Sequence, residues 1–226
     1  MPSHTLHRAA QVILVLCVPI VLLAVPLYAL WQPAYLRYQY SRSAFPASRF
    51  TDAERLRLSE TILRYTAGQI PLEQMAEMLT DDGTPALLPS EVEHLVDVRV
   101  VLQRFYLAGG IALALALLTG LLLAHWSPDR LARALYGGIG ITCAFILGAG
   151  AMALMDFDRF FTLFHGLFFR PGSWTFFYED TLIQLYPLPF WITAILHLLA
   201  GMGLLTIILL AVARRAGRRS ARSVQP

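Results

Sequence analysis

The chain has 226 residues, of which 57% are hydrophobic and only 15% are charged. This composition excludes an ordinary soluble domain, in which about a quarter of the residues are charged. Four apolar stretches reach the roughly 20 residues that a helix needs to cross a bilayer: 9–31, 105–126, 134–155 and 190–213. We therefore expect an all-α integral membrane protein with four transmembrane helices.

The charges between these spans predict their orientation. Residues 1–8, 127–133 and 214–226 together hold eight Arg and one acid, whereas residues 32–104 and 156–189 hold ten Arg and fourteen acids. Because cytoplasmic segments carry the excess of positive charge, we expect both termini and the 127–133 loop in the cytoplasm and the two larger segments outside it. The Arg-rich tail is expected to contact anionic lipid and not nucleic acid.

The first extracytoplasmic segment, 32–104, is predicted to contain short helices. A capping box at Thr51–Glu54 opens a helix that Gly68 can close. Pro71 suits the first turn of a second helix that reaches about Leu79, and a turn follows at residues 81–85.

A second capping box, Ser90–Glu93, begins a helix that we expect to run unbroken into the second span. Helical spacing places His94, Asp97 and Val101 on one face of this helix. His94 is thus predicted to lie just outside the membrane, with a carboxylate one turn away.

The second extracytoplasmic segment, 156–189, differs in being strongly aromatic. Six Phe residues between Asp156 and Phe169 predict a short helix that lies in the membrane interface and ends at Arg170–Gly172. His165 has phenyl rings one turn before and one turn after it, so its imidazole is expected in an apolar wall at headgroup depth.

Each candidate polar residue also has a purely structural interpretation. His94 could be a solvated surface histidine, and Asp97 its hydrogen-bond partner on the helix surface. Glu93 could be only the capping-box acid, and His165 only an interfacial polar tip. His197 lies within the fourth span, where it could hydrogen-bond a neighbouring helix.

Sequence motifs of several other enzyme classes are missing from the chain. It has no His-Glu-x-x-His, Gly-x-Ser-x-Gly, Walker or Cys-x-x-Cys motif. None of the four spans contains a carboxylate, which argues against a proton-coupled transporter.

The two histidine segments resemble a known family. Glu91-Val-Glu-His-Leu-Val-Asp-Val-Arg99, Asp156-Phe-x-x-Phe-Phe-x-x-Phe-His165-x-Leu-Phe-Phe with Trp174, and Leu182-Ile-x-Leu-Tyr-Pro187 are similar to segments of the four-span bacterial lipoprotein intramolecular transacylases. The resemblance covers nearly the whole chain and implies that His94 and His165 are the paired catalytic histidines. It further implies transfer of the sn-2 acyl chain of a diacylglyceryl-modified lipoprotein to the α-amine of its N-terminal cysteine.

The resemblance also implies the partners and the location. The substrates would be diacylglyceryl-modified bacterial lipoproteins held by membrane lipid, and the active site would lie on the extracytoplasmic face of the bacterial cytoplasmic membrane. An ester-to-amide transfer runs downhill, so this reaction needs no nucleotide or other cofactor.

The residues themselves suit this chemistry, because a neutral imidazole can take a proton from an amine and return one to an alkoxide. We expect Asp97 to orient His94, Arg99 to stabilise an oxyanion and Glu93 to bind the ammonium. Two alternatives remain open. One is a metal-dependent membrane hydrolase with His94, Asp97 and His165 as ligands, and the other is a scaffold without enzymatic activity.

Overall fold

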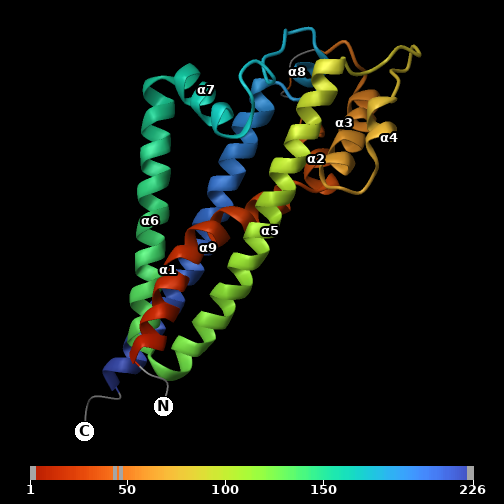
Figure 1. Ribbon diagram of the computed structural model, residues 1–226. Coiled ribbons are helices and arrows are strands. Elements are labelled where there is room, and N and C mark those ends of the chain that lie inside the picture. Colours follow the sequence, from red (N-terminus) through yellow and green to blue (C-terminus); the bar gives the residue numbers. More distant parts are fainter. Residues whose placement is uncertain (1–3, 43–44, 46–47, 223–226) are drawn as a thin grey trace. The chain divides into compact units, whose positions relative to one another are not determined.

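The computed structural model describes residues 4–42, 45 and 48–222. Over this part of the chain the secondary structure is helical, apart from a single β-bridge between Leu79 and Pro85. The helices are α1 (His4–Leu30), α2 (Pro33–Tyr40), α3 (Asp52–Thr66), α4 (Leu72–Ala76), α5 (Pro89–Trp126), α6 (Pro128–Met155), α7 (Phe157–Phe168), α8 (Thr181–Leu185) and α9 (Leu188–Arg222) (Figure 1). The expected all-α fold is confirmed.

Four of the described helices, α1, α5, α6 and α9, are long and apolar enough to cross a membrane. Two boundaries differ from expectation. α6 begins at Pro128, so most of the loop expected at 127–133 is helical, because proline fits the first position of a helix. α9 continues through the Arg-rich tail to Arg222, because Arg and Ala both favour helix.

The chain divides into two compact units. The first comprises Met1–Pro26, Leu107–Phe157 and Leu199–Pro226, and the second comprises Leu27–Tyr106 and Asp158–Leu198. The first unit contains most of the apolar length of the four long helices. The second contains α2, α3, α4, α8, nearly all of α7 and the first turns of α5.

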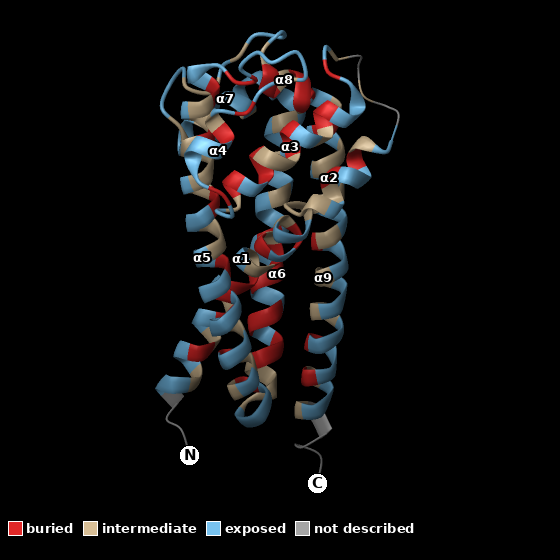
Figure 2. Ribbon diagram, turned by 90° about the vertical axis from the view of Figure 1, so that its right-hand side faces the viewer, coloured by how far each residue is buried: buried red, intermediate tan, exposed pale blue. Residues whose placement is uncertain are grey.

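Small residues allow the helices of the first unit to approach closely. A Cβ atom added to Gly138 of α6 would lie 2.5 Å from Val18 of α1, and one added to Gly109 of α5 would lie 2.7 Å from Ala24. Such contacts are typical of helices that associate in lipid. In the most apolar window of each long helix only 6–33% of residues are buried, and Figure 2 shows exposed positions along most of α9. The remaining apolar surface is therefore suited to contact with lipid.

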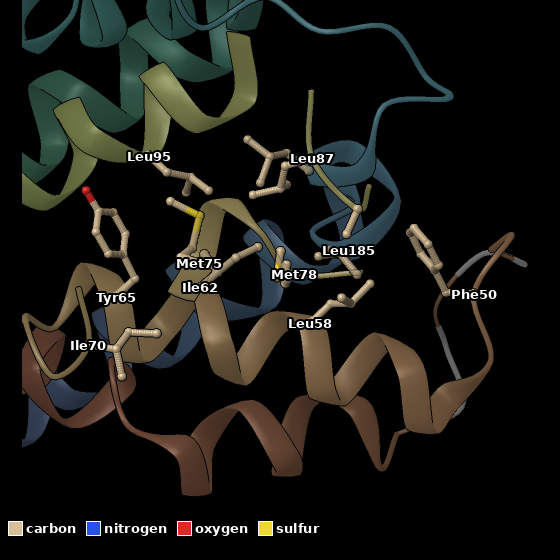
Figure 3. Close-up of a cluster of buried hydrophobic side chains, with 12 residues drawn as sticks. Phe50, Leu58, Ile62, Tyr65, Ile70, Met75, Met78, Leu87, Leu95 and Leu185 are labelled. Atoms are coloured by element: carbon tan, nitrogen blue, oxygen red, sulfur yellow. The ribbon is translucent and has the colours of Figure 1, made fainter. Parts of the chain in front are cut away.

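The second unit has its own hydrophobic core. Leu58 of α3, Met75 of α4 and Leu185 of α8 have no exposed surface, and Leu95 of α5 packs against the same cluster (Figure 3). This core joins three short helices to the beginning of a membrane-spanning one.

In the segment 32–104, the residues predicted to begin and end the first helix do so largely as expected. Thr51 caps α3 by accepting a hydrogen bond from the Glu54 amide, and Gly68 follows the helix with a φ of +80°. The Glu54 carboxylate does not reach back to Thr51 but accepts a hydrogen bond from the amide of Asp81, 27 residues further along the chain. α4 ends at Ala76, three residues before the predicted end, because Leu79 pairs with Pro85 across the expected turn.

The second capping box is shifted from its predicted position. α5 begins at Pro89, and the carboxylate that reaches back is that of Glu91, which accepts a hydrogen bond of 2.8 Å from the Leu88 amide. Its other oxygen accepts a hydrogen bond of 2.7 Å from the Leu182 amide at the start of α8. Glu91 has no exposed surface, and burial raises its pKa. Glu93 is therefore not the capping acid.

Two short helices were not predicted from the sequence. α2 follows α1 after two residues, and the hydroxyl of its last residue, Tyr40, donates to the carbonyl of Leu185 and contacts Ser59 of α3. α8 is held at its first residue, where the Thr181 hydroxyl donates to the Ala86 carbonyl. Both helices depend on contacts with residues distant in the sequence.

We predict that Glu91→Ala lowers the free energy of unfolding of the purified protein by about 3 kcal/mol, because two buried backbone N–H groups lose their acceptor. Glu73→Ala is the matched control, since Glu73 is exposed and its replacement should change stability by less than about 0.5 kcal/mol. Unfolding in detergent micelles measures both variants. Equal stability of the two would contradict the structural role of Glu91.

Candidate active site

Helix α7 positions His165 beside other aromatic rings. It has no buried residue, and Phe164 and Leu167 are among its exposed apolar side chains. As predicted, the helix ends just before the Arg170–Gly172 segment, in which Gly172 has a φ of +84°. The exposed apolar side chains are typical of a helix that lies in a membrane interface.

The protonation of the His165 ring is set by its own helix. Its Nδ1 lies 2.9 Å from the Phe161 carbonyl oxygen, which can only accept a hydrogen bond. Nδ1 therefore carries the proton in the neutral imidazole, and Nε2 keeps its lone pair. Burial lowers the pKa of His165 below its usual value, against the opposite effect of the Phe161 hydrogen bond. The ring is thus a neutral base near pH 7.

His94 lies in the second turn of α5 and is half-buried. Its ring packs against Phe169 and Phe176, with ring centroids 5.0 and 5.4 Å away. Burial first, and then the charge of His165, lower its pKa to about 4, although the charge of Asp97 and a hydrogen bond that the ring donates to the Ser173 backbone act in the opposite direction. Its Nδ1 is buried and has no hydrogen-bond partner.

The structure brings these two histidines together. The centroid of Phe169 lies 5.0 Å from that of His94 and 5.8 Å from that of His165, so the two imidazoles are separated by no more than the sum of these distances. Trp174 lies against His165 at 4.8 Å. We refer to the rings around the two histidines, Phe161, Phe169, Trp174 and Phe176, as the aromatic cluster.

Arg170, which we expected only to end the preceding helix, connects this segment to α5. Its guanidinium lies 2.6 Å from the Glu93 carboxylate and 3.9 Å from that of Asp97. Glu93, which we expected to bind the ammonium, is therefore engaged by Arg170. Asp97, which we expected to orient His94 directly, acts on the pKa of His94 through its charge. The two acids lie one turn apart and flank His94.

Arg99, which we expected to stabilise an oxyanion, has its guanidinium held by residues of another part of the second unit. Its guanidinium lies over the Tyr65 ring, 4.8 Å from the centroid, and donates to the Ile70 carbonyl at 3.2 Å. Through these contacts Arg99 ties α5 to the end of α3 and to the segment between α3 and α4.

His197 has the structural role that its alternative interpretation predicted. Its Nδ1 lies 3.0 Å from the hydroxyl of Tyr35, on α2, which also accepts a hydrogen bond from Gln39. His197 thus binds a neighbouring helix.

The metal-hydrolase alternative gains no support from this geometry. Among the residues that the structure describes, no three His, Cys, Asp or Glu side chains lie close enough together to hold a metal ion. His94, Asp97 and His165 accordingly do not form a ligand set.

The family model of the lipoprotein intramolecular transacylase Lit matches residues 11–191. The chain belongs to the Lit family. The match includes both histidines, Arg170 and the whole aromatic cluster. An uncharacterized protein of Aquifex aeolicus is 29% identical over 204 residues, which cover 87% of this chain and 92% of that protein.

Solved structures agree with this assignment at the level of the fold. The membrane-integral Lit of Bacillus cereus superposes with a TM-score of 0.73 at 16% identity, covering 97% of this chain and all of the other. A variant of that protein with one histidine replaced by alanine gives a TM-score of 0.75 at 17% identity, covering 96% of each chain.

The lowered pKa of His94 predicts how stability depends on pH. Above pH 6.5 the imidazole is neutral in both the folded and the unfolded chain, whereas between pH 6.5 and about 4 only the unfolded chain takes up the proton. This residue therefore makes the folded state less stable as the pH falls through that range.

We predict that His94→Gln makes the melting temperature in detergent fall less steeply than that of the unmodified protein between pH 6.5 and 4.5. His125→Gln serves as the control, because His125 is exposed, and should keep the original slope. Identical slopes for all three proteins would show that His94 is not desolvated.

Proposed function

We propose that this protein, as a Lit-family transacylase, moves the sn-2 acyl chain of a diacylglyceryl-modified lipoprotein onto the α-amine of its N-terminal cysteine, and that His94 and His165 carry out the proton transfers. The observation that supports this most strongly is the approach of both imidazoles to Phe169. The product is a lyso-form lipoprotein with an N-acyl cysteine and a monoacylglyceryl group.

The chemistry supplies a reason for a pair of imidazoles. The substrate's α-amine has a pKa of about 7.7–8.0 and is mostly an ammonium at neutral pH. It must lose two protons before it becomes an amide nitrogen. One of these protons replaces the acyl group on the glycerol oxygen, and the other leaves to solvent. Two neutral imidazoles with free lone pairs match this requirement.

The two ring environments suit different steps. The free Nε2 of His165 can accept the proton of the incoming ammonium, since Nδ1 is committed to the Phe161 carbonyl. The unpartnered Nδ1 of His94 can accept the proton released when the amine attacks. Because the pKa of His94 is about 4, its imidazolium is a strong acid that readily returns this proton to the leaving alkoxide.

The surroundings of the histidines suit a lipid substrate. Exposed apolar side chains of α7, among them Phe164, Leu167 and Phe168, are available to acyl chains. Arg170, which pairs with Glu93, fixes the segment after α7 to α5 and so positions the two imidazoles relative to each other. We propose that this arrangement replaces solvent around the reacting ester with apolar groups.

We further propose that the active site faces the extracytoplasmic side, with membrane spans at about 9–31, 105–126, 134–155 and 190–213. The Arg-rich termini support this orientation, because positive segments remain in the cytoplasm.

A topology reporter tests this orientation. Alkaline phosphatase, which is active only outside the cytoplasm, should be active when fused after Gln184 and inactive when fused after Arg222. The reverse pattern would place the histidines on the cytoplasmic side.

We predict that His94→Ala and His165→Ala each reduce formation of the lyso-form by at least about 100-fold, the usual contribution of general acid–base catalysis. Mass spectrometry of lipoprotein N-terminal peptides from cells expressing each variant measures the product. Expression and membrane insertion should stay near normal, because neither residue is needed to cross the bilayer.

His125→Ala is the control for these variants and should retain full activity. His197→Ala should lower the melting temperature through loss of the Tyr35 hydrogen bond. If both single variants at the proposed site kept most of the activity, the histidines would not perform the proton transfers.

A further inference from the structure

The proposed reaction also requires a hydrogen-bond donor for the ester carbonyl oxygen, and no residue has yet been given this role. When the amine attacks the ester, the carbonyl oxygen gains negative charge, and a hydrogen-bond donor aimed at this oxygen lowers the barrier. Arg99 is engaged by Tyr65 and Ile70, and Arg170 is engaged by Glu93. Both guanidinium groups therefore already have partners of their own in the structure.

The indole of Trp174 supplies a donor within the aromatic cluster. Its ring centroid lies 4.8 Å from that of His165 and 5.6 Å from that of Phe161. The preceding residue, Ser173, forms a backbone hydrogen bond with His94. The indole is therefore connected to both histidines, to one by ring packing and to the other through its neighbour in the chain.

The indole N–H has no acceptor in the structure. Trp174 Nε1 is buried away from solvent and makes no hydrogen bond. A buried N–H without a partner costs free energy, and a tryptophan that serves only as apolar filler places its N–H where it finds an acceptor. Ring packing alone does not require this N–H group.

A second atom without a hydrogen-bond partner lies in the same cluster, and this one is an acceptor and not a donor. Nδ1 of His94 is buried and without a partner, and a neutral ring whose other nitrogen carries the proton accepts a hydrogen bond there. A ligand that satisfies both atoms must offer one N–H group and one oxygen acceptor. An amine attacking an ester carbonyl offers both on adjacent atoms.

We propose that Trp174 is a catalytic residue whose Nε1–H donates a hydrogen bond to the carbonyl oxygen of the transferred sn-2 acyl group. This inference rests on the proposed transacylase function. The amine nitrogen forms a bond to the carbonyl carbon, and the indole N–H binds the resulting oxyanion. The bond to the glycerol oxygen then breaks, the carbonyl re-forms, and the imidazolium returns its proton to the glycerol oxygen.

Trp174→Phe tests the donor while keeping an aromatic ring. The purified protein is reconstituted in phosphatidylglycerol vesicles with a synthetic peptide that begins with dipalmitoylglyceryl-cysteine, and the N-acyl product is quantified by mass spectrometry. We expect kcat to fall about 100-fold, as on removal of a single oxyanion donor, with KM changed by less than about threefold. Trp126→Phe, at the far end of α5, is the matched control and should retain the original kcat.

The melting temperature separates loss of the donor from loss of packing. If Trp174→Phe melts more than a few degrees below Trp126→Phe, the decisive variant carries 3-benzothienylalanine at position 174, which keeps the shape of indole and replaces N–H with sulfur. A similar fall in kcat with this residue supports the proposal. The proposal is wrong if either of the two variants has a normal melting temperature and an unchanged kcat.

The same assay distinguishes failure of this inference from failure of the proposed function. If the unmodified protein forms no N-acyl product from this peptide, the transacylase function itself is wrong. If the unmodified protein is active and loss of the indole N–H has no effect on kcat, the function stands and the role of Trp174 is wrong.

Discussion

The buried carboxylate of Glu91 is the constraint on which the second unit depends. It accepts hydrogen bonds from the amides of Leu88 and Leu182, and so fixes both the start of α5 and the start of α8. A carboxylate without exposed surface is costly unless its oxygens are satisfied, and both oxygens here accept a backbone N–H. The next turns of the same helix carry His94 and the two acids that bind Arg170. The geometry of the candidate active site therefore follows from the way in which α5 begins.

Burial of the two imidazoles links this architecture to the chemistry. Aromatic rings exclude water from His94 and His165, which lowers the pKa of each histidine and keeps both neutral at physiological pH. Neutral rings can accept the protons of an amine, whereas the imidazolium of His94, once formed, is strongly acidic. Placing charge in this cluster destabilises the folded state, and in the reaction that we propose the same desolvation favours return of the proton to the leaving group. In the proposed function, the aromatic cluster thus favours catalysis at some cost in stability.

Local and periodic signals in the sequence predicted most of the fold. The apolar stretches identified the four long helices, Thr51 identified the start of α3, and the spacing of phenylalanines identified α7. The predictions failed where distant contacts decide the structure. α8 is only five residues long and is held by Glu91, and Arg170 finds its partner 77 residues away. The resemblance to the Lit family supplied the histidine pair and included Trp174, but that the Trp174 N–H lacks a partner can be recognised only in three dimensions.

The central claim is that His94 and His165 act as one unit on a single acyl transfer. A double-mutant cycle tests this claim most directly. The rate of N-acyl product formation is measured for the unmodified protein, His94→Ala, His165→Ala and the double variant, in vesicles and with equal amounts of folded protein. If the two imidazoles work together, the double variant should be little slower than the slower single variant, because the first substitution already removes their joint effect. Losses that multiply in the double variant would show that the histidines act independently.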